Sequence, residues 1–164
     1  MSESMSGAAP EGSAQSGPGE PAVLEDLDEA ECLRLISAGG VGRIAFTGRF
    51  GPTVLPVNYR LHEGTIVFRT VEDSPTDEDL RTGIADAEYK VAFEIDDFSM
   101  AAREGWSVLI QGALHHVDSE AERASVRESG VQPWASGPRE LYLRVIPSRI
   151  TGRRITRKPA AASG

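Results

Sequence analysis

The 164-residue chain has few of the residues that build disulfide frameworks or metal centres. It contains one cysteine, Cys32, and three histidines. A single cysteine excludes an internal disulfide and any metal site built from several cysteines. Among the 17 Lys and Arg residues only Lys90 and Lys158 are lysines, and no apolar run approaches the roughly 18–20 residues of a membrane span. We therefore expect no metal site and no membrane segment.

Short motifs of common catalytic sites are also missing. The sequence has no G-x-S-x-G, H-E-x-x-H or G-x-x-x-x-G-K-[ST] pattern. His115 and His116 are adjacent in an expected strand and would point to opposite faces, so at most one could face a site. Asp96 and Asp97 fit a solvated strand end better than a catalytic pair. The sequence alone therefore assigns no catalytic residue.

Acidic residues outnumber basic ones, 25 to 17, which gives a formal net charge of −8. Such a surface repels phosphate backbones, so a nucleic-acid partner is not expected. Residues 1–22 are dominated by Ser, Gly, Ala, Pro and Glu and are predicted to be a disordered tail. This tail lacks the basic start and apolar segment of a signal peptide, so we expect a cytoplasmic protein. Residues 157–164 are predicted to be a flexible C-terminal tail, which leaves residues 23–156 as one domain.

A helix is predicted to open the domain. Asp28 is its expected N-cap and Glu31 stands at the capping-box position three residues later. The pair Gly39-Gly40 is expected to end the helix and does not follow a strand, as a dinucleotide-binding loop would. Cys32 lies within this helix and is interpreted as a small buried residue rather than a reactive thiol.

The rest of the domain consists mainly of short strands. They are expected at residues 43–47, 53–61, 65–70, 89–95, 106–117 and 141–146, the fifth being the longest. Short helices are expected near 77–86, after a cap at Ser74 or Thr76, and over 118–128. Six strands at hairpin-like spacing, with too few helices for a doubly wound parallel sheet, predict a small antiparallel barrel.

Two segments are candidates for ligand binding. In Pro56-Val57-Asn58-Tyr59 a proline interrupts a strand, and the backbone groups left unpaired could recognise the edge of a flat heteroaromatic ring. An edge-strand proline without a ligand is an equally good interpretation. Phe68-Arg69-Thr70 ends a strand before a helix start, where a guanidinium, a hydroxyl and helical N–H groups suit a phosphate. Arg and Thr at a strand end are, however, more often plain surface residues.

The order of several segments resembles the pyridoxamine 5′-phosphate oxidase-like family, and more narrowly its flavin-binding split-barrel proteins. These segments are GRIAF, VLPVNYRL, IVFRT, KVAFEID, GWSVLIQG, PW and YLRVIPSRITGRRI, spread over nearly all of residues 25–156. The resemblance implies a mainly β fold, a six-stranded antiparallel split β-barrel of Greek-key type with a few short helices, working as a homodimer. It also implies FMN, or alternatively a deazaflavin, bound along the dimer interface.

The resemblance carries over to particular positions. The implied cofactor-binding residues are Pro56, Val57, Asn58, Arg69, Thr70, Arg81, Trp106 and Ser107. The first three would lie along the isoalloxazine ring, the next two would meet the ribityl phosphate, and the last two would approach from the long strand. After residue 70 the sequence departs from the family's usual short Gly-containing loop: the loop is longer and no Lys stands before Leu80. It carries five acids, namely Glu72, Asp73, Asp77, Glu78 and Asp79. Arg81 is the candidate to replace that Lys, and the acids are expected to repel a phosphate.

The function implied by the resemblance is FMN-dependent oxidation or reduction of a small molecule. The flavin would supply the hydride chemistry, so no side chain need act as an acid or base. Oxidation of vitamin B6 phosphates is disfavoured, because only Arg139 and Arg144 could form a substrate-phosphate pocket. Two alternatives stay open: a non-catalytic dimer that binds or sequesters a flavin or deazaflavin, and a cofactor-free relic. The acidic loop favours both over a working FMN enzyme.

Overall fold

The computed structural model describes residues 21–81 and 88–157. Its strands are β1 (Val23–Leu27), β2 (Gly40–Gly48), β3 (Gly51–His62), β4 (Thr65–Thr70), β5 (Tyr89–Ser99), β6 (Glu104–His116) and β7 (Leu141–Thr156). Its helices are α1 (Glu29–Ile36), α2 (Pro75–Asp79) and α3 (Glu120–Arg127). The two predicted tails fall outside the described residues, except for residues 21, 22 and 157.

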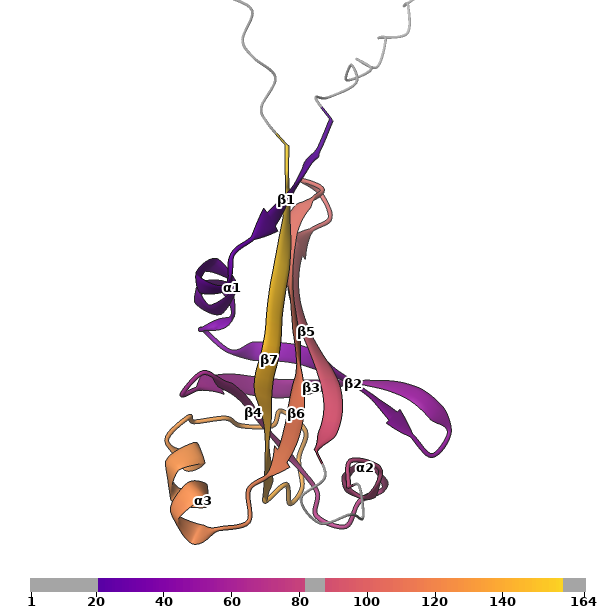
Figure 1. Ribbon diagram of the computed structural model, residues 1–164, viewed down its shortest axis with the longest axis vertical. Helices are drawn as coiled ribbons and strands as arrows, with labels where there is room; N and C mark the ends of the chain where they lie inside the picture. Colours follow the sequence, from indigo (N-terminus) through magenta and orange to yellow (C-terminus); the bar gives the residue numbers. More distant parts are fainter. Residues whose placement is uncertain (1–20, 82–87, 158–164) are drawn as a thin grey trace, which may run out of the picture.

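Six of the strands close into a ring. They pair in the order β2–β3–β4–β7–β6–β5, and β5 pairs back with β2, always antiparallel. Strand β7 pairs with β6 on one side, and with β4 and then β1 on the other (Figure 1). The mainly β split barrel that the sequence predicted is confirmed.

Strand β7 is much longer than the expected segment 141–146. Gly112 of β6 pairs with Pro147 and Gln111 pairs with Arg149, so Ser148 is the extra residue of a β-bulge. A bulge tolerates a proline, which has no N–H to donate, and the strand continues to Thr156. The prediction that Pro147 follows the end of the strand was wrong, and β7, with 16 residues, is longer than β6, with 13.

The helix starts follow the predicted caps. The Asp28 side chain accepts a hydrogen bond from the Glu31 N–H at 2.8 Å, and Gly39 has a φ of +73° after the helix ends. Ser74 caps α2, which begins at Pro75 and ends earlier than predicted, at Asp79; residues 82–86 of the expected span lie outside the described residues. Strand β1 was not predicted, because four of its five residues are exposed and show no apolar alternation.

Pro56, which was expected to interrupt a strand, lies in a part of β3 that has a paired strand on one side only. Residues 51–58 pair only with β2, so Pro56 lies on a sheet edge, as one of the sequence interpretations held. Tyr59–His62 pair with β4, through a hairpin whose two turn residues, Glu63 and Gly64, have φ values of +49° and +74°. Two successive positive φ angles are typical of the type I′ turns that join twisted strands.

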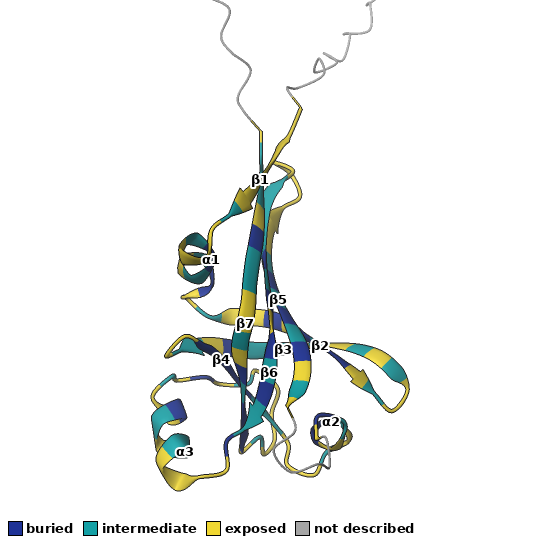
Figure 2. Cartoon of the chain, viewed as in Figure 1, coloured by how far each residue is buried: buried dark blue, intermediate teal, exposed yellow. Residues whose placement is uncertain are grey.

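The core has two parts, and its buried residues are spread along the strands of the ring and the helices (Figure 2). The larger part fills the barrel around Phe68 and Phe93, and it includes Cys32, whose side chain is fully buried, as predicted. Burial raises the pKa of the Cys32 thiol. The smaller part lies between α3 and the barrel wall and consists of Val67, Val117, Val126, Val131 and Tyr142.

Candidate functional site

Strands β3 and β4 separate at a point that we call the β3–β4 fork. Tyr59 and Phe68 form the last pair of their ladder, and the next residues, Asn58 and Arg69, have left it. The fork therefore brings together five of the eight predicted cofactor-binding residues. They are Pro56, Val57 and Asn58 on the edge of β3, and Arg69 and Thr70 at the end of β4.

The side chains of Asn58 and Arg69 both hold the backbone of the segment 131–140. Asn58 Oδ1 accepts a hydrogen bond from the Trp134 N–H at 2.8 Å, and Arg69 Nε donates one to the Arg139 carbonyl at 2.7 Å. The Arg69 guanidinium also lies over the ring of Tyr142, 5.1 Å from its centroid. The sequence did not predict that Asn58 and Arg69 bind the segment 131–140, because the residues that these two hydrogen bonds join are 70 and 76 positions apart.

Arg81, the candidate replacement for the family's lysine, binds a carboxylate of its own chain. Its Nε and Nη2 atoms lie 3.1 and 3.2 Å from the two oxygens of Asp77, whose side chain is fully buried. Asp77 also accepts hydrogen bonds from the Asp73 N–H and from His116. Burial raises the pKa of Asp77, but these hydrogen bonds outweigh it and hold the pKa below its ordinary value.

The other acids of the loop after β4 face different groups. Glu78 and Asp79 form ion pairs with Arg49 at 3.0 and 2.7 Å. Glu72, by contrast, lines a cleft together with Arg69. Of the five acids expected to repel a phosphate, Asp77, Glu78 and Asp79 are therefore paired with arginines, and Glu72 is the one that shares a cleft with the predicted phosphate ligand.

Trp106 and Ser107 lie far from the fork within one chain. Trp106 pairs with Arg154 of β7, whereas Arg69 pairs with Tyr142 of the same strand. These partners are twelve residues apart, or about 40 Å of extended strand. One bound flavin could not contact both places on a single subunit, so the structure does not bring these two residues to the other five.

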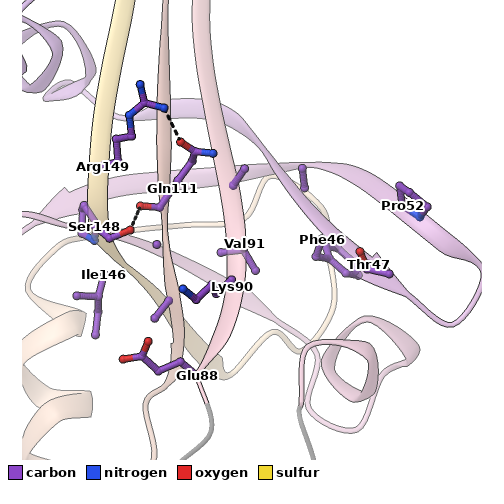
Figure 3. Close-up of a pocket in the computed structure, with 15 residues that line it drawn as sticks. Phe46, Thr47, Pro52, Glu88, Lys90, Val91, Gln111, Ile146, Ser148 and Arg149 are labelled. Atoms are coloured by element: carbon purple, nitrogen blue, oxygen red, sulfur yellow. Dashed lines mark hydrogen bonds between the residues drawn. The ribbon is translucent and has the colours of Figure 1, made fainter.

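A wide groove lies elsewhere, on the outer face of β2, β5, β6 and β7 (Figure 3). It has a volume of about 800 Å³ and contains none of the predicted site residues. Small and apolar side chains form much of its floor, including Ala92, Ala113 and the 46 % exposed Ile146, while Lys90 and Arg149 supply charge. This exposed apolar sheet face was not apparent from the sequence.

A carboxylate pair lies on the neighbouring part of β5. Glu94 and Asp96 share one guanidinium, with Arg43 Nη1 at 3.2 and 3.1 Å from their oxygens. Burial and the adjacent Asp96 raise the pKa of Glu94 to about 7. The sequence drew attention to Asp96 and Asp97, but the side chain that pairs with Asp96 is Glu94, two residues away on the same face of the strand.

Among the described residues, 21–81 and 88–157, no cluster of three or more His, Cys, Asp or Glu side chains is arranged to hold a metal ion. No helix in this part of the chain has the length and apolar character needed to cross a membrane.

The strands close into a ring, and β3 and β4 separate beyond the Tyr59–Phe68 pair. This arrangement defines a split β-barrel protein. The family model for pyridoxamine 5′-phosphate oxidase matches residues 28–154, so the chain belongs to this family. It is 31% identical over 144 residues to the uncharacterized protein Rv0080 of Mycobacterium tuberculosis, covering 88% of this chain and 93% of the relative.

Solved structures agree with this assignment. The FAD-binding protein of Mycobacterium smegmatis is 30% identical, with a TM-score of 0.64, and the match covers 79% of this chain and 98% of that one. An FAD-binding protein of Mesorhizobium loti matches with a TM-score of 0.67 over 83% of this chain and 99% of that one. At 18% identity this second likeness shows the fold alone.

Proposed function

We propose that the protein is a flavin-dependent oxidoreductase that holds FMN at the β3–β4 fork. The observation that carries the proposal is the arrangement of Asn58 and Arg69 on either side of the fork in a member of this family. A flavin is also what the M. smegmatis relative binds, as its name states. The residues at the fork offer a flat strand edge and a guanidinium, which suit a ring and a phosphate.

Each residue at the fork has a separate task. The unpaired edge of β3 from Pro56 to Asn58 can hydrogen-bond the rim of a planar ring through its backbone groups. Arg69 offers a planar fork of donors to phosphate oxygens, and the Thr70 hydroxyl can add another. When bound, the flavin supplies hydride transfer, while these residues fix its position and its electrostatic surroundings.

A second copy of the chain would complete this site. Trp106 and Ser107 are too far from the fork to reach the same ligand within one subunit, so we propose that they approach it from a partner. The exposed apolar face around the groove of Figure 3, with Ile146 and the 60 % exposed Val54, suits burial in a homodimer. Light scattering is expected to give twice the 17.6 kDa chain mass, and a monomer at micromolar concentration would contradict the dimer.

Visible absorption of the purified protein, mixed with FMN and then desalted, tests flavin binding directly. We expect a flavin spectrum that bleaches under anaerobic NADH or NADPH and recovers when a small-molecule acceptor is added. Arg69→Ala should weaken FMN by about 1.5–3 kcal/mol, the range for a hydrogen bond to a charged group, and leave riboflavin binding unchanged. If the ratio of FMN to riboflavin affinity does not change, the phosphate assignment of Arg69 is wrong.

The second candidate is a dimer that holds a flavin or deazaflavin without turnover. The observation that favours it is the segment 131–140, which already occupies donors and acceptors of Asn58 and Arg69. A cofactor held beneath such a segment would have restricted access to a substrate. Tight flavin binding with no reduction by either nicotinamide would support this candidate over the oxidoreductase.

A further inference from the structure

The sheet formed by β5, β6 and β7 has a side that points away from the core, which we call the outer face. Phe93 of β5 is fully buried on the inner side, so its neighbour Glu94 lies on the outer face. On β7, Gly152 points inward, because a Cβ there would lie 2.5 Å from Cys32 Sγ of α1, and Arg153 therefore points outward. Two grooves of about 800 and 430 Å³ lie on the outer face, and α1 packs on the opposite side.

The register of the three strands sorts the charges of the outer face into columns. Residues directly opposite each other in an antiparallel pair lie on the same side of the sheet. Three successive rows, from β5 through β6 to β7, are Asp96, Ser107 and Arg153; Glu94, Leu109 and Thr151; and Ala92, Gln111 and Arg149. The column on β5 is therefore acidic in the first two rows, the column on β7 is basic, and the column on β6 between them carries no charge.

Each charged column lacks a full counterpart in its own chain. Glu94 and Asp96 share the single guanidinium of Arg43, at 3.2 and 3.1 Å, which leaves one negative charge in excess. Among the residues that the structure describes, Arg153 forms no ion pair, even with Asp26, its register partner on β1. The outer face thus carries an acidic side and a basic side that do not neutralise each other within one chain.

Two-fold symmetry restricts how two copies of such a face can meet. In a two-fold interface, if residue i of one copy contacts residue j of the other, then j also contacts i. An axis along β6 places β5 of each copy against β7 of the other, so each acidic column meets a basic one and the uncharged column faces itself. An axis across the strands would set each column against itself, and facing like charges are strongly unfavourable. The charge pattern therefore selects the axis along β6.

We infer that two copies of the chain pack through the outer face about a two-fold axis along β6, with Arg153 of each copy paired with Asp96 of the other. The inference rests on the homodimer of the proposed function, to which it adds the face, the axis and the ion pair. Ser107 lies between Asp96 and Arg153 in the same row, so this packing places in the interface one of the two residues proposed to act across it.

The other side chains of the outer face fit the same arrangement. Arg149 lies in the row of Ala92 and so faces an uncharged side chain of the second copy. Lys90 lies one row further, in the row of Ile146, and their places on the face are seen in Figure 3. Ile146 is 46 % exposed in the single chain and would be covered by the second copy. Gln111 faces its own copy at the axis, where a side-chain amide can both donate and accept a hydrogen bond.

Charge reversal at the two paired positions tests this interface. Asp96→Arg and Arg153→Asp each place like charges across it, so the dissociation constant of either dimer should rise about a hundredfold or more in analytical ultracentrifugation. A mixture of the two variants restores opposite charges at both pairs of a heterodimer, and we expect it to dimerise nearly as tightly as the unmodified protein. Arg34→Asp is the control for net charge, because Arg34 is 66 % exposed on α1, on the other side of β7.

The possible outcomes separate this interface from the proposed function. Single variants that dimerise as tightly as the unmodified protein would overturn the interface and leave the homodimer to another surface. Variants that fold, as shown by thermal melts, but stay monomeric when mixed would overturn the pairing of Asp96 with Arg153. An equal loss of dimer in Arg34→Asp would show a general charge effect and count against the pair. A monomeric unmodified protein that still binds FMN would overturn the interface and the homodimer but not the flavin site.

Discussion

Asp77 of α2 and His116 of β6 are joined side chain to side chain, with 2.9 Å between Asp77 Oδ1 and His116 Nε2. The contact ties the acidic loop after β4 to the end of a barrel strand 39 residues further along the chain. Asp77 accepts further hydrogen bonds from Arg81 and from the Asp73 backbone, so every donor around this buried carboxylate stabilises its charged form. The negative charge of Asp77 is therefore compensated within the fold and stabilises it, so it is not available to repel a phosphate.

Asp77→Asn should destabilise the protein. The amide has about the same shape but cannot accept the four hydrogen bonds that the carboxylate accepts from Asp73, Arg81 and His116. Hydrogen bonds to charged groups contribute about 1.5–3 kcal/mol. We expect a loss of about that size in the free energy of unfolding, measured by urea denaturation. Asp79→Asn is the control: Asp79 pairs with the partly exposed Arg49, and its replacement should cost less than about 1 kcal/mol. Equal losses in the two variants would contradict the special role of Asp77.

The pH dependence of this contribution follows from the lowered pKa of Asp77. The folded protein keeps the carboxylate charged at a pH where the unfolded chain has begun to protonate it. The stabilisation is therefore complete above the ordinary value of 3.8 and is lost as the pH falls through the lower pKa of the folded state. In acid titrations followed by circular dichroism, the difference in stability between wild type and Asp77→Asn should shrink below about pH 4. A constant difference down to pH 2 would contradict this account.

Local sequence signals determined a large share of the fold. The cap at Asp28, the helix end at Gly39-Gly40 and the strand at residues 65–70 depend on neighbouring residues, and the structure confirms each of them. The extension of β7 through Pro147 could not be predicted, because the bulge depends on the facing strand β6. Strand β1 was missed for a related reason: it has no apolar face of its own and forms by pairing with the end of β7.

In the candidate site, too, some features follow from the local sequence and others depend on contacts between distant residues. The two sides of the fork, around Asn58 and Arg69, were predicted separately from sequence, and the antiparallel register of β3 and β4 explains why they meet. The hydrogen bonds from the segment 131–140 to both residues depend on long-range packing and leave no periodic signal.

Cys32 should react slowly with thiol reagents in the native protein. Its side chain has no exposed surface, and burial raises the pKa of the thiol, so both access and the thiolate fraction are reduced. With excess 5,5′-dithiobis(2-nitrobenzoate) at pH 8, we expect the single thiol to react at a rate that rises steeply with urea concentration. Immediate reaction in the absence of urea would show that the barrel opens beside α1.

Gly112→Ala should disturb the junction of β6 and β7 at the bulge. A Cβ at this position would collide with the Ile146 carbonyl oxygen and lie 2.8 Å from its carbon, both backbone atoms that cannot rotate away. We expect a loss of about 3 kcal/mol in unfolding free energy, at the upper end for overpacking. Gly64→Ala is the comparison, because it has a φ of +74° with no neighbour within 4 Å and should cost about 1–2 kcal/mol. A smaller loss at Gly112 than at Gly64 would argue against the bulge geometry.

Glu94 should make the protein less stable as the pH rises toward neutrality. Its pKa in the folded state is about 7, against an ordinary 4.5, because burial and the negative charge of Asp96 outweigh Arg43. Between these two values the folded chain still holds a proton that the unfolded chain has released, so raising the pH through this window disfavours the folded state. Below about pH 4.5 both states are protonated and the residue contributes no pH dependence.

Glu94→Gln removes this titration while keeping the shape of the side chain. Its melting temperature relative to wild type should therefore rise from pH 5 to pH 7 and level off above that, as measured by calorimetry at constant ionic strength. Asp96→Asn provides an independent check, because it leaves Glu94 in place but removes the adjacent charge that raises its pKa. In that variant the pH-dependent loss should begin at the same pH, level off at a lower pH and be smaller. Parallel pH profiles for wild type and Glu94→Gln would show that Arg43 outweighs burial and Asp96 and keeps the pKa of Glu94 from rising.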